Sequence, residues 1–310
     1  MDRRDFLRLG AGGAVVAAAG CVRAPDKKPD KSYSFDPHRG LRLPWPGLTK
    51  PVRLWMVADT HFGLHDARDD QYADNYRRMA QWGAKKEPFE KMLASAKEQK
   101  PDLLVLLGDN ISFPTCANVE YLKSELDACG LPWIFVAGNH DWHFEGEEGS
   151  DFEQRDKWTK GRLAPLYQGE DPLACSRVVN GVRIVMIDNS LYHVLPEQLA
   201  FWQAEVAKGD PTCLCMHIPF WQPGWSVTTC ACPTWGAATD PYWQIERRQR
   251  WAEKLMPSTF AFREAVLSAP NLVGVFAGHE HVWQFARERG QNLFTVIGNG
   301  KGDYLDVTIG

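Results

Sequence analysis

Five short segments of this chain carry side chains of the kinds that bind transition metals, and each directly follows an apolar run. The segments are Asp59-Thr60-His61, Gly108-Asp109-Asn110, Gly138-Asn139-His140-Asp141, His217-Ile218-Pro219 and Gly278-His279-Glu280-His281. In the first and last, two metal-binding residues stand two positions apart, which places both side chains on one side of an extended segment. Mixed imidazole and carboxylate groups suit manganese, iron or zinc rather than calcium. The spacing therefore predicts a transition-metal site.

The elements that must position these segments are buried strands. Seven runs rich in β-branched or aromatic residues predict strands at residues 52–58, 103–107, 133–137, 182–187, 212–216, 272–277 and 293–297. Helical periodicity lies between them, over residues 88–99, around residues 119–126, after Pro196, and after Ser258, which is placed to cap its helix. Residues 145–154 and 220–256 lack regular periodicity. Strands that alternate with helices predict an α/β sandwich, in which ligands gather beyond the carboxyl ends of the strands.

The ordered set D-x-H, G-D, G-N-H-D, H and G-H-x-H resembles the calcineurin-like metallophosphoesterase family, and it spans residues 59–281. The alternative is that every member is a polar residue with a structural role, but buried histidines and aspartates are costly without partners. The resemblance implies a four-layer α/β/β/α sandwich with two central mixed sheets. It also implies one catalytic domain over residues 51–310, with a tryptophan-rich insert at about residues 220–256.

The resemblance further implies which residues bind two metal ions, divalent or trivalent manganese, iron or zinc. The first ion would be held by Asp59, His61, Asp109 and His281. The second ion would be held by Asp109, Asn139, His217 and His279, so that Asp109 would bridge the two. Two cations about 3.5 to 4 Å apart can generate a bridging hydroxide and hold both ends of an in-line displacement.

Two further residues of the G-N-H-D motif are implied to act without binding metal. His140 would donate a proton or a hydrogen bond to the leaving oxygen. Asp141 would orient His140, and its alternative role is that of a local turn carboxylate.

The chain also departs from two related phosphatase classes. Position 61 is histidine where purple acid phosphatases have glycine, and Ser112 and Phe113 stand where a tyrosine ligand would be sought. These differences argue against a tyrosinate–iron site. Asn110 follows Asp109, and the second acid and the arginine of the Ser/Thr protein phosphatases are absent from that motif. Protein phosphatase activity is therefore not expected.

The first residues predict an export address. Residues 1–20 resemble a twin-arginine (Tat) signal, because Arg3 and Arg4 precede a short run of glycine, alanine and valine. The run ends at Cys21 in a sequence similar to a bacterial lipobox, so we expect either a lipid anchor on Cys21 or a soluble periplasmic product. Residues 21–50 are proline-rich and predict a linker. The expected partner in export is the Tat machinery.

Composition narrows the function classes. The chain has 310 residues and a formal net charge of −4, with a pI of about 6.2. A nuclease needs a basic groove to bind its nucleic-acid strand. Because this chain has an acidic pI, dedicated nucleic-acid binding is not expected. The expected function is metal-dependent hydrolysis of small organic phosphate mono- or diesters in the bacterial cell envelope. A nuclease and a non-catalytic metal-binding protein on the same fold are the alternatives.

We expect the tryptophan-rich insert to determine which substrate is bound. Trp221 and Trp225 are its tryptophans nearest to His217, in a segment that leaves the predicted site. A tryptophan face suits stacking on a sugar, a base or a lipid-like group. We therefore expect both to bind substrate as part of a specificity cap, with packing onto the sheet as the alternative.

The eight cysteines do not predict a disulfide framework. Cys116 and Cys129 flank a predicted helix and are candidates for a bridge. Cys213 and Cys215 are expected to be small buried hydrophobes, and Cys230 and Cys232 to form a loop disulfide or remain free thiols.

Overall fold

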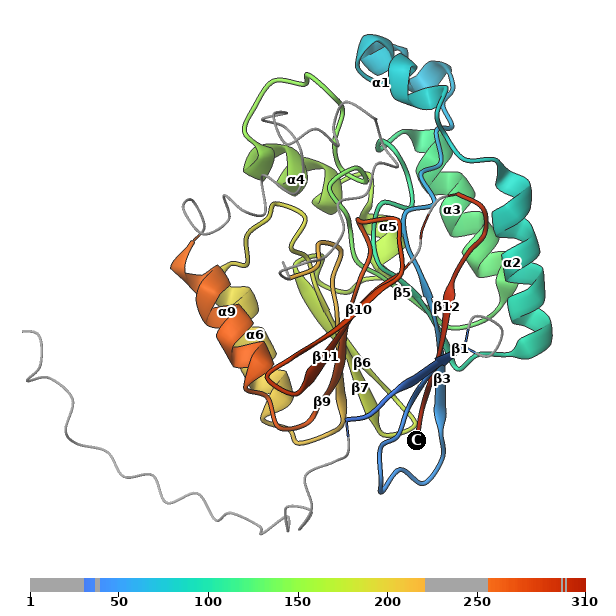
Figure 1. The fold of residues 1–310 in the computed structure, drawn as a ribbon. Helices are drawn as coiled ribbons and strands as arrows, with labels where there is room; N and C mark the ends of the chain where they lie inside the picture. Colours follow the sequence, from blue (N-terminus) through green and yellow to red (C-terminus); the bar gives the residue numbers. More distant parts are fainter. Residues whose placement is uncertain (1–30, 37–39, 221–255, 297, 299) are drawn as a thin grey trace, which may run out of the picture.

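The structure, a computed structural model, describes residues 31–36, 40–220, 256–296, 298 and 300–310. Two six-stranded sheets face each other, and helices cover the outer face of each (Figure 1). This arrangement is the α/β/β/α sandwich that the sequence predicts. Trp221, Trp225 and the rest of the tryptophan-rich insert lie outside the described residues, as do Cys21, Cys230, Cys232 and the expected Tat signal.

The first sheet combines parallel central strands with segments from both ends of the chain. Its order is β1 (Ser34–Asp36), β2 (Gly40–Leu43), β12 (Leu305–Ile309), β3 (Val52–Val57), β4 (Leu103–Leu106) and β5 (Trp133–Phe135). The strands β3, β4 and β5 are parallel, and β12 pairs antiparallel with β3 and parallel with β2. Residues 34–43 lie within the expected linker, so part of that segment forms strands of the domain.

The second sheet has four parallel strands between two antiparallel edges. Its order is β10 (Gln284–Glu288), β11 (Gln291–Thr295), β9 (Leu272–Ala277), β8 (Thr212–Cys215), β7 (Val182–Ile187) and β6 (Ala174–Val179). The strands β11, β9, β8 and β7 are parallel to one another. Their carboxyl ends therefore open on one side of the sheet, which is where the predicted motifs His217 and His279-Glu280-His281 follow β8 and β9.

Helices pack against the outer face of each sheet through separate apolar clusters. The helices α2 (Lys86–Gln99), α3 (Cys116–Cys129) and α5 (Ala164–Tyr167) cover the first sheet, and η2 (Ala67–Tyr72), α1 (Ala73–Ala80) and α4 (Asp151–Lys160) contribute side chains to the same apolar cluster. The second sheet packs against α6 (Pro196–Val206) and α9 (Pro257–Leu267). No helix among the described residues is long and apolar enough to cross a membrane.

Side-chain alternation along β3 divides the core between the layers. Leu54 and Met56 join the cluster between the two sheets, while Trp55 and Val57 join the cluster beneath the helices. Because both faces are covered, the strand reads as a continuous apolar run rather than as an alternating one. This explains why the central strands were predictable from the sequence.

The structure also tests the predictions made for individual cysteines and for two helix starts. Cys116 and Cys129 are both free, since they lie at opposite ends of a 14-residue helix, about 20 Å apart, which is too far for a disulfide. Cys213 and Cys215 are fully buried, as expected. The helix α4 begins inside the stretch without periodicity, because Ser150 and Glu153 form a capping box. Met256, not Ser258, is the N-cap of α9, whose first residue is Pro257.

Candidate metal centre

The five predicted segments meet beyond the carboxyl ends of five parallel strands. Asp59 and His61 follow β3, Asp109 follows β4, and the segment 138–141 follows β5. From the second sheet, His217 follows β8 and the segment 278–281 follows β9. The two sheets thus contribute ligand-type residues to the same end of the molecule.

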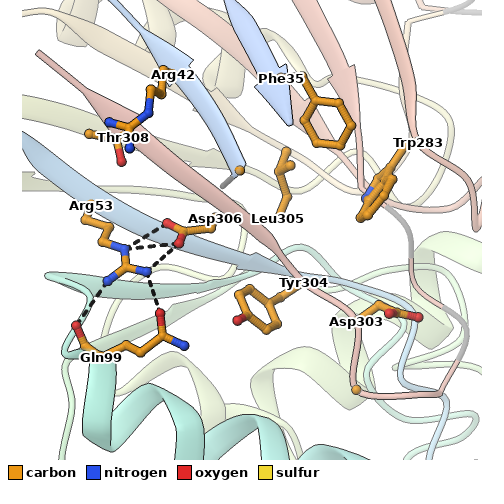
Figure 2. Close-up of a pocket in the computed structure, with 12 residues that line it drawn as sticks. Phe35, Arg42, Arg53, Gln99, Trp283, Asp303, Tyr304, Leu305, Asp306 and Thr308 are labelled. Carbon is orange, nitrogen blue, oxygen red and sulfur yellow. Dashed lines mark hydrogen bonds and ion pairs between the residues drawn. The ribbon is translucent and has the colours of Figure 1, made fainter. Parts of the chain in front are cut away.

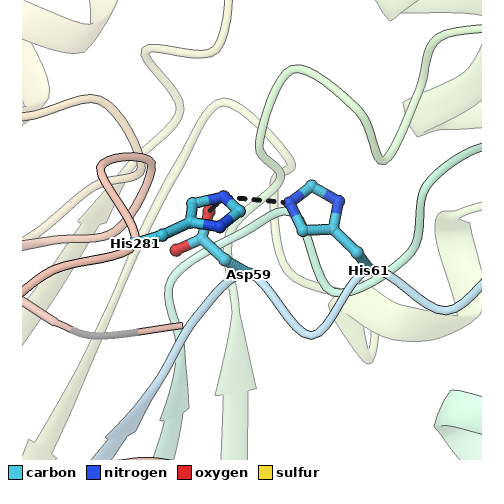
Figure 3. Close-up of side chains that lie close together, drawn as sticks. All are labelled: Asp59, His61 and His281. Carbon is cyan, nitrogen blue, oxygen red and sulfur yellow. Dashed lines mark hydrogen bonds and ion pairs between the residues drawn. The ribbon is translucent and has the colours of Figure 1, made fainter. Parts of the chain in front are cut away.

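The outer cluster consists of Asp59, His61 and His281, and each offers one ligand atom within 4.8 Å of the others. Figure 3 shows the two imidazole rings and the carboxylate converging. The Nε2 atoms of His61 and His281 are 3.2 Å apart, and His281 Nε2 lies 3.4 Å from Asp59 Oδ1. The histidine side chains are 19% and 17% exposed, whereas Asp59 is fully buried. This cluster therefore faces solvent on its histidine side.

The inner cluster consists of Asp109, His217 and His279, whose ligand atoms also lie within 4.8 Å of one another. His217 Nε2 is 3.1 Å from Asp109 Oδ2 and 3.1 Å from His279 Nδ1. All three residues are at most 4% exposed. The inner cluster is thus enclosed by protein.

Asp109 stands between the two clusters. Its Oδ2 atom contacts His217 of the inner cluster and lies 3.9 Å from His61 Nε2 of the outer one. Its Oδ1 atom accepts a hydrogen bond from the backbone N–H of His140 at 2.8 Å. This position is the one that a carboxylate shared by two cations would need.

The donor set fits two cations. Imidazole nitrogens and carboxylate oxygens converge in each cluster, and such mixed groups bind manganese, iron and zinc. Asn139 adds a buried amide oxygen that accepts no hydrogen bond within the described part of the chain. Its neighbours Gly138 and His140 both lie against Asp109, so Asn139 belongs to a loop that adjoins the clusters. A buried acceptor without a donor is costly, and a cation would satisfy it.

Hydrogen bonding to the backbone directs the His217 ring. Its Nδ1 lies 2.7 Å from the carbonyl oxygen of Leu107, which can only accept, so Nδ1 carries a proton and Nε2 is the atom directed at the cluster. Burial by itself lowers the pKa of His217, but the carboxylates of Asp109 and Asp59 outweigh it and raise that pKa to about 10. Without a cation, a proton on Nε2 takes its place.

The outer histidines have the opposite electrostatic balance. Burial lowers the pKa of His61 well below its usual value and that of His281 to about 4, although Asp109 opposes both shifts. Both rings are therefore neutral at neutral pH, and each has a lone pair to offer a cation.

The backbone is held in an unusual conformation at the ligand-type residues. A left-handed φ occurs at five of them: Asp59 (53°), His61 (49°), Asp109 (50°), His279 (74°) and His281 (53°). Such a conformation costs a residue with a side chain about 1–3 kcal/mol and persists where surrounding structure enforces it. The motif glycines allow the tight approach, since a Cβ on Gly138 would stand 2.2 Å from Asp109 Oδ1. Strain concentrated at these residues indicates a functional site.

Asp141 organises the backbone of two loops. Its Oδ2 accepts hydrogen bonds from the N–H groups of Asp109 (2.7 Å) and Gly138 (2.6 Å), and its Oδ1 accepts one from Ile111 (3.0 Å). Burial and the nearby Asp109 carboxylate raise the pKa of Asp141 to about 7. The family resemblance implies that this carboxylate orients the His140 ring, but its hydrogen bonds go to backbone amides instead. Asp141 therefore acts on His140 only indirectly, by fixing the backbone of the loop that contains both residues.

His140 lies at the border of the outer cluster. Its ring meets the His61 ring edge-on, with centroids 5.0 Å apart, and the residue is partly exposed. A side chain in this position can reach a group bound at the clusters.

A hollow of about 600 Å³ on the outer side of the first sheet is a different feature (Figure 2). Within it, Arg53 donates to both carboxylate oxygens of Asp306 and to the Gln99 side chain. That guanidinium is thus already occupied. None of the clustered ligand-type residues lines the hollow, so it is not the candidate site.

One motif beside the site was missed from the sequence. Asp188, Asn189 and Ser190 follow β7, so they form a further polar segment at a strand end. Asn189 is 1% exposed and makes hydrogen bonds to the backbone of His217 and Ile218. The available signal was the polar triplet directly after a predicted strand, the same signal that identified the other five segments.

Comparisons with known proteins agree with this geometry. Residues 52–283 match the family described as calcineurin-like phosphoesterase. A probable cyclic nucleotide phosphodiesterase from Psychrobacter arcticus is 28% identical over 106 residues, which are 34% of this chain and 36% of that protein. The match thus spans about a third of the length of that relative.

Solved structures share the fold at low sequence identity. A dimetal phosphatase from Danio rerio has a TM-score of 0.50 at 16% identity, covering 81% of this chain and 88% of that one. A purple acid phosphatase from yellow lupin (Lupinus luteus) has a TM-score of 0.53 at 12% identity, covering 85% and 47%. At these identities the likeness establishes the architecture.

Proposed function

The chain belongs to the calcineurin-like phosphoesterase family and is therefore a hydrolase of phosphate esters, and we propose that it cleaves small organic phosphate mono- or diesters with two transition-metal ions. One observation carries the proposal: the structure holds two three-residue ligand clusters, and the carboxylate of Asp109, which belongs to the inner cluster, also lies 3.9 Å from His61 of the outer one. That family depends on dinuclear metal sites, and a shared carboxylate holds two cations together by offsetting their repulsion.

Each cluster would hold one ion. Asp59, His61 and His281 would hold the outer ion, and His217, His279 and Asn139 the inner one, with Asp109 shared by both. When bound, two such cations polarise phosphoryl oxygens and lower the pKa of water at the site. Manganese, iron and zinc all suit this ligand set.

The remaining residues of the site would act on the substrate directly or through the backbone. The His140 ring borders the outer cluster, where it can donate a proton to the leaving oxygen. Asp141 keeps the loops that carry Asp109 and His140 in register by accepting three backbone hydrogen bonds.

The substrate would carry an organic group beyond its phosphate. The likeness to a probable cyclic nucleotide phosphodiesterase supports a diester among the first substrates to test. The net charge of −4 disfavours long polyanions and hence a nuclease. Trp221 and Trp225 follow His217 closely in the chain, which supports a role for them in binding the organic group.

Turnover by the metal-loaded protein tests this function. We expect manganese-loaded protein to hydrolyse p-nitrophenyl phosphate, bis-p-nitrophenyl phosphate or a cyclic nucleotide, with the ratio of the rates separating monoesterase from diesterase. A protein that binds two ions and cleaves none of these esters would instead be a non-catalytic metal-binding protein. Preferential cleavage of single-stranded DNA would identify a nuclease.

We place this activity in the cell envelope. Support comes from Arg3, Arg4 and the apolar run that ends at Cys21. Changing both arginines to lysine should leave the full-length chain in the cytoplasm, as measured by cell fractionation. Changing Cys21 to serine should release a lipidated protein from the membrane fraction and should leave a soluble periplasmic protein where it was.

A further inference from the structure

We propose that Asn189 is a positioning residue that sets the affinity of the inner cluster for its cation. The inference rests on the proposed function insofar as it takes the inner cluster to be a metal site. Asn189 is not itself a ligand in that proposal. It acts on His217, whose Nε2 atom is directed at the cluster.

The side chain of Asn189 holds two successive residues of the His217 segment. Its Oδ1 accepts hydrogen bonds from the N–H groups of His217 (3.2 Å) and Ile218 (3.0 Å). Its Nδ2 donates to the carbonyl oxygen of Ile218 at 2.6 Å. Only a side-chain amide supplies an acceptor and a donor at this reach, and the residue is buried. The backbone of His217 is thereby fixed from one side.

The His217 ring is fixed from the opposite side by the first sheet. Its Nδ1 donates to the carbonyl oxygen of Leu107, which ends the apolar run that precedes Asp109. The backbone anchor at Asn189 and the ring anchor at Leu107 together determine where Nε2 points. Outer-shell partners of this kind typically change metal affinity by about 10- to 100-fold when removed.

The turn that carries Asn189 is itself tied to the first-sheet half of the site. Asp188 Oδ1 accepts hydrogen bonds from the N–H (2.8 Å) and the hydroxyl (2.5 Å) of Ser190. The Ser190 hydroxyl in turn accepts one from Trp142 Nε1 at 2.8 Å. Trp142 follows Asp141, which accepts a hydrogen bond from the N–H of Asp109, so residues 188–190 connect the His217 segment with the loop after β5. The position of Asn189 is therefore not free to adjust.

A matched control lies at the far end of the same strand. Asn271 donates from Nδ2 to the carbonyl oxygens of Val206 (3.1 Å) and Asp210 (2.6 Å), beside the start of β8. Asn271 directly precedes β9 in the chain, and its side chain secures the backbone next to the amino end of β8. Asn189, in contrast, secures the backbone beyond the carboxyl end of β8. Removing the Asn271 side chain should affect stability without reaching the cluster.

The experiment compares manganese binding by the metal-stripped full chain, followed by calorimetry and by electron paramagnetic resonance, with thermal unfolding as a second measurement. In Asn189→Ala we expect one of two sites to weaken by about 10- to 100-fold while the other keeps its affinity. In Asn271→Ala we expect a lower melting temperature and two unchanged affinities. Asn189→Asp keeps the acceptor for the two N–H groups but loses the donor to the carbonyl oxygen of Ile218, so it should weaken the same site as well.

Three outcomes would overturn the proposal. These are unchanged affinities in Asn189→Ala, equal weakening of both sites, and equal weakening in the Asn271 control. If Asn189→Ala does not fold, Asn189→Asp decides by the same criterion. Failure of the proposed function is recognised separately, because wild-type protein would then bind manganese at two sites and hydrolyse no ester.

Discussion

The outer and inner clusters use the same residue types, one aspartate and two histidines, but they lie at different depths. The outer histidines are partly exposed, whereas every inner residue is buried. Burial lowers the pKa of the outer histidines, while the carboxylates raise the pKa of His217 to about 10. Within this single site, burial lowers the pKa of a histidine and a neighbouring carboxylate raises it. The carboxylates have the larger effect on His217, whose ring lies 3.1 Å from Asp109.

The two clusters also differ in the hydrogen bonds that hold their histidines in place. The inner residue His217 is held by Leu107 on its ring and by Asn189 on its backbone. The outer residue His61 is held by its own strained backbone and by a hydrogen bond from its N–H to the carbonyl oxygen of Asp109. The outer cluster is thus the solvent-facing half of the site, and the inner cluster is the half enclosed by protein.

The largest expected effect comes from the residue that belongs to both clusters. Asp109→Ala should remove both ions and abolish turnover, because its carboxylate faces both clusters. Metal content of the purified variant, determined by mass spectrometry, checks this. A full content of two ions would contradict the shared role of Asp109.

The next effect should separate the two clusters. His61→Ala and His217→Ala should each lower the metal content from two ions to one. Without metal, His217→Ala should also cost more stability, by about 1–3 kcal/mol, because it leaves the buried Leu107 carbonyl without its donor. Chemical unfolding of the metal-free variants measures this. Equal losses of stability would show that depth does not distinguish the clusters.

A smaller effect concerns chemistry rather than metal binding. His140→Ala should keep both ions and lose about 10²- to 10⁴-fold in rate on esters with poor leaving groups. The loss should shrink with p-nitrophenyl phosphate, because p-nitrophenolate leaves without much help from a proton. Rates on the two ester types, with metal content as the control, give the answer. Equal losses on both types would exclude proton donation by His140.

The smallest effect concerns the two tryptophans that we propose to bind the organic group of the substrate. Trp221→Ala and Trp225→Ala should raise KM severalfold for an ester with a large organic group and spare small phosphate esters, since stacking on one aromatic side chain is worth about 0.5–1.5 kcal/mol. Steady-state kinetics of folded, metal-loaded variants test this. Unchanged KM values for both ester sizes would assign these tryptophans to packing.

Much of the fold was predictable because the central strands are buried on both faces. A run such as Val52–Val57 has to be apolar throughout, and this pattern is visible in one sequence. The strands β1 and β2 were not predicted, because Ser34–Asp36 and Gly40–Leu43 are short, partly exposed and set in a proline-rich segment. β2 becomes a strand by pairing with β12, which comes from the other end of the chain, and β1 becomes one by pairing with β2.

The types of the ligand-type residues and their order along the chain can be read from the sequence, because metal chemistry restricts the residue types and glycine opens three of the five segments. The division of those residues into an outer and an inner cluster, and the backbone groups that Asp141 and Asn189 bind, became visible with the folded chain. Those contacts join residues about 30 positions apart through side-chain hydrogen bonds to backbone atoms. Every residue presents the same backbone groups, so a sequence carries no mark of which ones are bound.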